Sequence, residues 1–156
     1  IQELRQAVEK AHASDAALEA LSLCDRTLAY LEGTSPLLFS LLPMGTIHGD
    51  FSARNVLCVD GHVSALLDFE LAHEGNVELE LARFYQKELH GSPARIAAFQ
   101  AGYAQQAFLA PGFGRRLPLY LLGEALIGCS WSKNAVDAYF DECLATLRRF
   151  LARRGG

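Results

Sequence analysis

The 156-residue sequence has no apolar run long enough to cross a membrane, and no secretion signal. It also lacks internal repeats and low-complexity segments. No charge of one sign dominates, because 14 basic and 18 acidic residues give a net charge of -4. Since binding to phosphate backbones requires a basic face, this balance argues against nucleic acid as the main partner. We therefore expect an ordinary soluble protein with no membrane partner.

Cysteine is sparse, and its positions exclude the common metal-binding patterns. The four cysteines, Cys24, Cys58, Cys129 and Cys143, are scattered without the spacing of metal ligands. Cys58 and Cys129 lie in apolar surroundings, which predicts buried thiols. The simplest interpretation is a reduced protein of the cytoplasm.

Lysine is also scarce, and no lysine stands in a phosphate-binding motif. The only lysines are Lys10, Lys87 and Lys133, all within helical patterns or at helix ends. The pattern G-x-x-x-x-G-K-[ST] does not occur. A nucleotide-binding loop of that kind is therefore not encoded in this chain.

The most informative stretch runs from residue 47 to 70 and reads IHGDFSARNVLCVDGHVSALLDFE. Two apolar runs, at residues 56–59 and 63–67, flank the dipeptide Asp60-Gly61, which is a strong signal for a two-residue hairpin turn. The first run is suited to a buried strand. The sequence thus predicts a short β-hairpin in this stretch.

Three polar residues accompany the predicted hairpin. Asn55 stands at its start and Asp68 at its end, so folding brings the two side by side, and Asp50 lies in the loop just before. Oxygens of this kind suit a hard cation such as Mg²⁺. Phosphoryl transfer from ATP requires one carboxylate that accepts or orients the hydroxyl proton. It also requires an Asn and a second Asp that hold a metal ion on the phosphates.

The motif His48-Gly49-Asp50, then Asn55, then Asp68-Phe69-Glu70 resembles the catalytic and metal-binding motifs of the aminoglycoside phosphotransferase and choline kinase family. That family is similar to the protein kinases, whose loop reads H-R-D-x-x-x-x-N and whose metal-binding Asp lies in D-F-G. Gly49 replaces the Arg and Glu70 replaces the last Gly, and both changes point to the small-molecule kinases.

The resemblance continues at residues 76–82, where the family usually has Asp-Pro-x-x-Asp-Leu-Ala. Here Asn76, Val77 and Glu80 depart from the Asp, Pro and Asp. That segment is mainly structural in the family, so these departures leave the predicted chemistry unchanged.

The resemblance implies an ATP- and Mg²⁺-dependent O-phosphotransferase. The substrate would be a hydroxyl of an aminoglycoside-like antibiotic or a related small metabolite. Asp50 would be the catalytic base, while Asn55 and Asp68 would bind the nucleotide through Mg²⁺. We expect the change of Asp50 to Asn to spare folding and to remove turnover.

Four further residues of the motif have two interpretations each. Glu70 is a candidate metal ligand or an exposed loop residue. Arg54 is a candidate catalytic cation beside the transferred phosphate, or a partner of an acidic side chain such as Glu70 or Glu74. Ser52 is a candidate for nucleotide binding or a loop cap. His48 is expected to lock the loop through hydrogen bonds rather than to act as an acid or base.

The predicted fold class is α+β and mainly helical, as in the C-terminal lobe of a protein-kinase-like enzyme. Residues 1–156 are expected to form one domain, the catalytic and substrate-binding lobe. Nothing in the sequence supplies the N-terminal ATP-binding lobe, and the first residue is Ile rather than Met, so that lobe is expected to lie upstream of Ile1 or to have been removed. The predicted elements are helices at 2–13, 16–31 (capped at residues 14–15 and stopping at Gly33), 78–89, 94–109 (with Ser92 as cap and Pro93 at its first position), 117–131 and 135–152, a strand at 46–48, and a polar loop at 71–77.

The acidic residues outside the motif are predicted to be mainly structural or solvated. Glu74, Glu78, Glu80 and Glu88 are typical of a solvated helix face. In the resembling family the acceptor pocket is built by C-terminal helices. The candidates there are Glu124, Asp137, Asp141 and Glu142.

Two other functions remain open at this level. The first is a pseudokinase-like binding or scaffold domain, which is disfavoured because Asp50, Asn55 and Asp68 are all present. The second is a metal-dependent hydrolase, which lacks a two-metal ligand set. Because the sequence supplies no ATP-binding lobe, the fragment alone is expected to transfer phosphate poorly or not at all.

Overall fold

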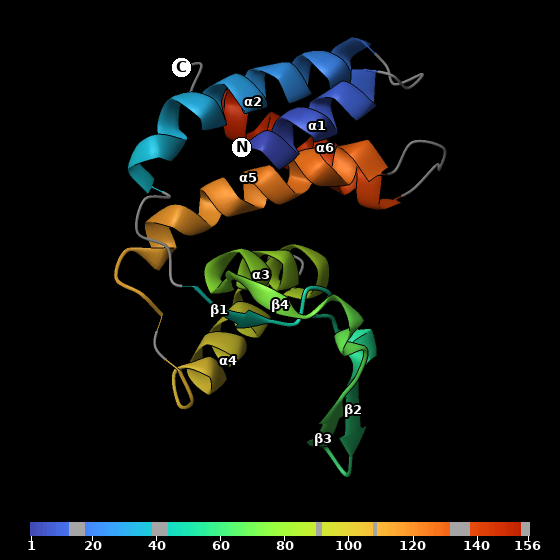
Figure 1. The fold of residues 1–156 in the computed structure, drawn as a ribbon, viewed down its shortest axis with the longest axis vertical. Helices are drawn as coiled ribbons and strands as arrows, with labels where there is room; N and C mark the ends of the chain where they lie inside the picture. The colour runs from blue at the N-terminus through green and yellow to red at the C-terminus, as the bar shows by residue number, and fades with distance from the viewer. Residues whose placement is uncertain (13–17, 39–43, 90–91, 108, 132–137, 154–156) are drawn as a thin grey trace. The chain divides into compact units, whose positions relative to one another are not determined.

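The structure is a computed structural model, and it describes the chain except for residues 13–17, 39–43, 90–91, 108, 132–137 and 154–156. The described residues are mainly helical, with two small antiparallel sheets (Figure 1). This confirms the predicted α+β fold class. Among these residues, no helix combines the length and apolarity that a membrane span requires.

The chain divides into two compact units. Unit 1 comprises residues 1–41 and 121–156, and unit 2 comprises residues 42–120. The described elements of unit 1 are α1 (Gln2–His12), α2 (Leu18–Leu38), the second part of α5 (Phe113–Trp131) and α6 (Ala138–Ala152). Helix α2 packs against α1 and α6. The side chains of Leu31, Leu122, Leu126 and Leu147 are almost fully buried and form the centre of this unit.

Helix α2 is longer than predicted, so the expected stop at Gly33 is wrong. The helix continues through Gly33 to Leu38. The Thr34 hydroxyl donates to the carbonyl oxygen of Tyr30 at 2.8 Å, one helical turn back. A helical Gly costs about 1 kcal/mol relative to Ala, which is too little to end a helix whose face is buried. The predicted cap at residues 14–15 lies outside the described residues.

Unit 2 carries the strands and the motif. Its described elements are β1 (Met44–Ile47), β2 (Val56–Val59), β3 (His62–Leu66), β4 (His73–Asn76), α3 (Val77–Phe84), a π-helical turn (Tyr85–Leu89), α4 (Pro93–Tyr103) and the first part of α5. Two 3-10 turns, Ala53–Asn55 and Phe69–Leu71, flank the hairpin.

Strand β4 corrects the prediction of a polar loop at residues 71–77. It pairs antiparallel with β1, with Ile47 opposite His73 and Met44 opposite Asn76. Its sequence, His-Glu-Gly-Asn, has no apolar alternation. Only pairing with β1, a long-range event, makes this segment a strand, so the local pattern could not reveal it.

The predicted hairpin is confirmed. Strands β2 and β3 pair antiparallel, and the turn residues Asp60 and Gly61 both have positive φ, 50° and 78°. Such values are those of the tight turns that suit twisted hairpins.

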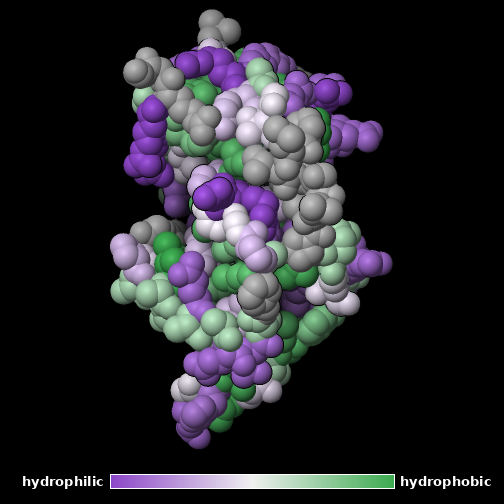
Figure 2. Space-filling view, turned by 90° about the vertical axis from the view of Figure 1, so that its left-hand side faces the viewer, coloured by the Kyte–Doolittle hydropathy of each residue, from purple (hydrophilic) through white to green (hydrophobic). Residues whose placement is uncertain are grey.

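The burial predicted for the first hairpin strand is wrong. Leu57 and Val59 are 46% and 60% exposed, and Val63 on β3 is 71% exposed. Hydrophobic residues are visible among hydrophilic ones at the lower end of Figure 2, where the hairpin lies. Cys58 is exposed as well, against prediction, whereas Cys129 is buried as expected.

Several helix boundaries also differ from the predicted ones. The helix expected at 78–89 is an α-helix followed by the π turn, α4 ends at Tyr103, and α5 begins early, at Phe113. The predicted start of α4 is confirmed, because the Ser92 hydroxyl accepts from the Arg95 amide at 3.5 Å and Pro93 follows directly.

A chain of aromatic rings ties the loop before the hairpin to the helices of unit 2. Phe51 stacks on Phe84 of α3, with ring centroids 4.7 Å apart. Phe84 contacts Phe99 of α4 at 4.9 Å, and Phe99 contacts Tyr103 at 6.0 Å. Aromatic pairs at such distances add stabilisation beyond area burial. The loop therefore rests on the helical part of unit 2.

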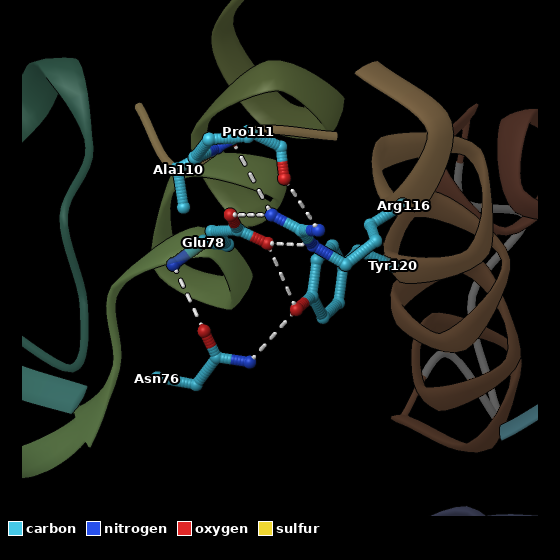
Figure 3. A network of polar contacts seen from close by, with 6 residues as sticks. All are labelled: Asn76, Glu78, Ala110, Pro111, Arg116 and Tyr120. Atoms are coloured by element: carbon cyan, nitrogen blue, oxygen red, sulfur yellow. Dashed lines mark hydrogen bonds and ion pairs between the residues drawn. The ribbon is translucent and has the colours of Figure 1, made fainter. Parts of the chain in front are cut away.

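The start of α3 is anchored by a buried carboxylate (Figure 3). Glu78 is 1% exposed, so the prediction of a solvated face is wrong here. The Arg116 guanidinium binds it through two hydrogen bonds, of which Nε to Oε2 measures 2.6 Å. This bidentate pairing satisfies the buried charge, and the hydrogen bond to Glu78 raises the pKa of Arg116.

Two neutral groups complete this network. The Tyr120 hydroxyl donates to Glu78 Oε2 at 3.1 Å and accepts from Asn76 Nδ2 at 3.1 Å. The Asn76 side-chain oxygen in turn accepts from the Glu78 amide at 3.0 Å, which caps α3. Burial raises the pKa of Tyr120 to about 12, so the phenol stays protonated at neutral pH. Asn76 thus performs the capping role for which Asp is also suited.

Candidate active site

The loop of residues 48–55, here called the Asp50 loop, is locked by the buried His48. Its Nε2 donates to the carbonyl oxygen of Leu67 at 2.7 Å, and its Nδ1 accepts from the Asp50 amide at 3.3 Å. Both bonds together require the neutral tautomer with its proton on Nε2. The predicted loop-locking role of His48 agrees with these contacts.

Gly49 allows the loop to turn next to a neighbouring backbone. Its φ is 85°, and a Cβ atom there would lie 2.4 Å from the carbonyl oxygen of Leu71. Any other residue would meet both the left-handed strain and a backbone clash. The glycine therefore fixes the path by which the chain reaches Asp50.

Asp50 lies between two cations and keeps part of its carboxylate at the surface. Its Oδ2 accepts a hydrogen bond from Arg54, and its Oδ1 lies 3.6 Å from Lys87 Nζ. The side chain of Asp50 is 20% exposed. Burial alone would raise the pKa of Asp50, but Arg54 and then Lys87 outweigh it and hold the pKa below its ordinary value. The group is therefore ionised at neutral pH.

Arg54 pairs with Asp50, not with the acidic residues that the sequence suggested. Its side chain is 70% exposed, and its ion pair with Asp50 spans four residues across the 3-10 turn. Neither Glu70 nor Glu74 forms an ion pair with it among the described residues. Arg54 thus brings positive charge directly to the carboxylate.

Asn55 and the end of the hairpin meet behind Asp50. The buried Asn55 donates from Nδ2 to the backbone carbonyl of Asp50 at 3.0 Å. The Leu67 amide donates to the Asn55 carbonyl at 2.8 Å. Asp68 follows immediately, with a left-handed backbone at φ 65° and ψ 59°. The hairpin therefore brings all three polar positions of the motif to one place.

Asn55 and Asp68 are two residues at this place with side-chain oxygens left for a ligand. Because Nδ2 of Asn55 is engaged, its Oδ1 remains as an acceptor. The Asp68 carboxylate makes no hydrogen bond or ion pair with another described residue. Within the described part of the chain, no group of three or more His, Cys, Asp or Glu could hold a metal ion. Mg²⁺ often takes only one or two protein ligands and completes its shell with phosphate oxygens and water.

Comparison with known proteins identifies the family. The model of the phosphotransferase enzyme family matches residues 1–119. The chain belongs to this family. The resemblance found in the motif is thereby confirmed, and no curated protein sequence matches the chain.

Solved structures similar to this member of the phosphotransferase enzyme family include an aminoglycoside phosphotransferase. It is a thermostable mutant of aminoglycoside phosphotransferase APH(4)-Ia, in a ternary complex with AMP-PNP and hygromycin B. The two sequences are 22% identical, the TM-score is 0.49, and the match covers 95% of this chain. The chain spans 42% of the length of that protein chain.

Two glutamates form hydrogen bonds with the backbone of the Asp50 loop, and the sequence did not predict these contacts. Glu80 Oε1 accepts from the Gly49 amide at 2.7 Å, and Glu88 Oε1 accepts from the Ala53 amide at 3.0 Å. Glu80 and Glu88 are partly exposed and each also binds an amide of the loop, whereas Glu74 is exposed. The available signal was that Glu80 stands where the phosphotransferase family usually has Asp, so the carboxylate is retained at that position.

Ser52 and Glu70 have contrasting surroundings. Ser52 is 3% exposed, and its hydroxyl has no hydrogen-bond partner among the described residues. Glu70 is exposed within the 3-10 turn that follows Asp68. Their predicted roles in nucleotide and metal binding stay predictions.

A cavity of about 340 Å³ lies against the aromatic side of the Asp50 loop. Its walls include His48, Phe51, Phe69, Phe99 and Tyr103. Asp50 is not among the lining residues. The cavity therefore belongs to the packing side of the loop rather than to the carboxylate.

The acidic residues predicted for an acceptor pocket lie in unit 1. Glu124 is buried, Glu142 is partly exposed and Asp141 is exposed, while Asp137 lies outside the described residues. Their role in binding an acceptor stays a prediction.

Proposed function

We propose that this chain is the catalytic part of an ATP- and Mg²⁺-dependent phosphotransferase that acts on a hydroxyl of a small molecule. The observation that carries the proposal is the position of Asp50. Its carboxylate is partly exposed, contacts two cations, and lies where the hairpin brings Asn55 and Asp68 together. Membership of the phosphotransferase enzyme family supports the same reaction class.

In the proposed reaction, the acceptor hydroxyl binds to the Asp50 carboxylate. Its oxygen forms a bond to the γ-phosphorus of ATP while the bond from that phosphorus to the β–γ bridging oxygen breaks. ADP leaves with the electron pair, and the hydroxyl proton passes to Asp50. Because the pKa of Asp50 is low, the carboxylate mainly orients the hydroxyl and takes the proton late.

The other residues of the motif would bind the phosphates of ATP or neutralise their charge. Asn55 and Asp68 would hold Mg²⁺, and Glu70 is the proposed additional ligand. When bound, the ion would neutralise phosphate charge. Arg54 would place its exposed guanidinium at the transferred group, where a cation offsets developing charge. Ser52 would bind the nucleotide only if its buried hydroxyl becomes accessible.

The remaining surface for ATP is proposed to come from an N-terminal lobe outside this sequence. The exposed hairpin residues Leu57, Val59 and Val63 offer an apolar surface next to the motif, and we propose that the lobe packs there. We also propose a cytoplasmic location, because the four cysteines are free and thiols stay reduced in that compartment.

The test is a phosphorylation screen of the full-length protein with ATP and Mg²⁺. The acceptors are hygromycin B and other aminoglycosides, amino alcohols and sugars, and mass spectrometry identifies the product. We expect acceptor-dependent ADP release, which Asp50→Asn lowers by about 10²–10⁴-fold while the melting temperature and nucleotide affinity stay unchanged. Equal turnover by wild type and Asp50→Asn would overturn the proposal, and nucleotide binding without transfer to any acceptor would favour a scaffold role.

A further inference from the structure

The helix after the family motif contains a π-helical turn, Tyr85–Leu89, directly behind the Asp50 loop. Single π turns are rare and occur frequently at functional sites. Adjacent residues of a regular α-helix do not face the same neighbour. In this turn two successive side chains, Lys87 and Glu88, both reach the Asp50 loop.

The two contacts hold opposite ends of a short segment. Lys87 Nζ lies 3.6 Å from Asp50 Oδ1, and Glu88 Oε1 accepts from the Ala53 amide at 3.0 Å. One contact acts on the side chain of Asp50 and the other on the backbone three residues later. The π turn thereby fixes both the path of the loop and the direction of its carboxylate.

Two buried side chains anchor the π turn itself. Tyr85 and Leu89 are 4% and 6% exposed. The ring of Tyr85 makes edge contacts with Phe99 and Phe113, with centroids 5.7 and 6.3 Å apart. Lys87 extends from this buried base, and its own side chain remains 39% exposed. Its ammonium is therefore held near Asp50 without being removed from solvent.

The two oxygens of Asp50 differ in their partners. Arg54 donates a hydrogen bond to Oδ2, whereas Lys87 lies 3.6 Å from Oδ1, beyond the usual length of a hydrogen bond. The other polar contacts of this residue, from its amide to His48 and from Asn55 to its carbonyl oxygen, are made by the backbone. Oδ1 is thus the oxygen that a hydroxyl group can approach without displacing Arg54.

We propose that Lys87 is a positioning residue of the site, whose ammonium holds the Asp50 carboxylate with Oδ1 turned toward the acceptor hydroxyl. The proposal rests on the proposed phosphotransferase function. Lys87 acts through Asp50 and not by touching the substrate. An ion pair this exposed contributes little to stability, so replacing Lys87 should leave the melting temperature nearly unchanged.

The test compares Lys87→Met and Lys87→Arg with wild type in the full-length protein. For Lys87→Met we expect kcat to fall by about tenfold or more, with the KM values for ATP and acceptor and the melting temperature nearly unchanged. Loss of kcat without a change in KM marks an interaction that matters in the transition state. Lys87→Arg should restore most of the lost kcat, because it keeps the positive charge. The matched control is Lys10→Met on α1, which removes the same charge and should retain wild-type kinetics.

Three results would overturn the inference. If Lys87→Met kept the wild-type kcat, the positioning role of Lys87 would be rejected, but the proposed function would not. An equal loss in Lys87→Met and Lys87→Arg, together with a lowered melting temperature, would assign Lys87 to packing. A wild-type protein without acceptor-dependent turnover would reject the proposed function and this inference together.

Discussion

Two carboxylate–arginine pairs among the described residues of unit 2 have the same charges and opposite surroundings. The side chains of Glu78 and Arg116 are 2% and 14% exposed. Those of Asp50 and Arg54 are 20% and 70% exposed. Each pair joins one carboxylate to one guanidinium through hydrogen bonds, so the charges alone do not distinguish the two pairs.

The two carboxylates differ in how many of their oxygens are already hydrogen-bonded. Both oxygens of Glu78 are bound, one by Arg116 alone and the other by Arg116 and Tyr120. In Asp50, one oxygen has only a long contact with Lys87. A buried, fully bonded carboxylate organises the fold, while a partly exposed one can meet a ligand. Burial and remaining hydrogen-bond capacity therefore distinguish the structural Glu78 pair from the Asp50 pair proposed to act in catalysis.

The largest expected effect comes from breaking the buried pair. Arg116→Met leaves the Glu78 carboxylate buried without its cation, and we expect it to lower the free energy of unfolding by about 3–5 kcal/mol. Chemical denaturation of the full-length protein measures this loss. A second change, Glu78→Gln in the same protein, should recover part of the loss because the uncompensated charge is removed. An unchanged denaturation midpoint for Arg116→Met would show that the pair does not stabilise the fold.

The next prediction tests the backbone conformation at Gly49, the residue that precedes Asp50. Gly49→Ala should destabilise the protein by about 1–3 kcal/mol, because the new Cβ combines positive φ with a backbone clash at Leu71. Gly61 is a matched control, since its φ is 78° but a Cβ there meets nothing within 4 Å. Gly61→Ala should therefore show only the left-handed strain, about 1 kcal/mol. Equal losses for the two changes, measured by thermal melting, would remove the clash from the explanation.

A smaller effect concerns the phenol at the buried pair. Tyr120→Phe removes a donor to Glu78 and an acceptor for Asn76, and we expect a loss of about 1 kcal/mol. The folded pKa of Tyr120, about 12, lies above its ordinary value of 10.0. The associated stability is fully present below pH 10 and is lost as pH rises toward 12. Wild type should therefore lose its advantage over Tyr120→Phe across that range, and a constant difference would contradict the burial argument.

The smallest effect on stability is expected at the exposed pair. Arg54→Met should leave the melting temperature nearly unchanged, because exposed ion pairs contribute little. The same change should lower phosphotransfer by the full-length protein, since the proposed role of Arg54 is at the transferred group. Arg115 on α5 is also exposed, and Arg115→Met serves as the control for loss of one positive charge. A large drop in melting temperature for Arg54→Met would make the two pairs alike and remove the contrast.

The sequence by itself determined the hairpin and the motif around it, because both depend on local chemistry. Asp60-Gly61 specifies a tight turn whose two residues take positive φ, and this turn pairs the strands next to it. An irregularity between Leu57 and Cys58 then shifts the register by one residue before the pairing reaches Asn55. The helical patterns likewise predicted most helices, and the Ser92-Pro93 start of α4 was correct because a cap is a local hydrogen bond.

Tertiary structure alone decided the partners of the charged residues and the strand β4. The same acidic pattern on and after α3 leads to a buried pair at Glu78 and to loop contacts at Glu80 and Glu88. Lys87 reaches Asp50 from a π turn that lies far along the chain from the Asp50 loop. A sequence pattern fixes which groups are present, but the energy of a charge depends on burial and on partners brought from distant segments.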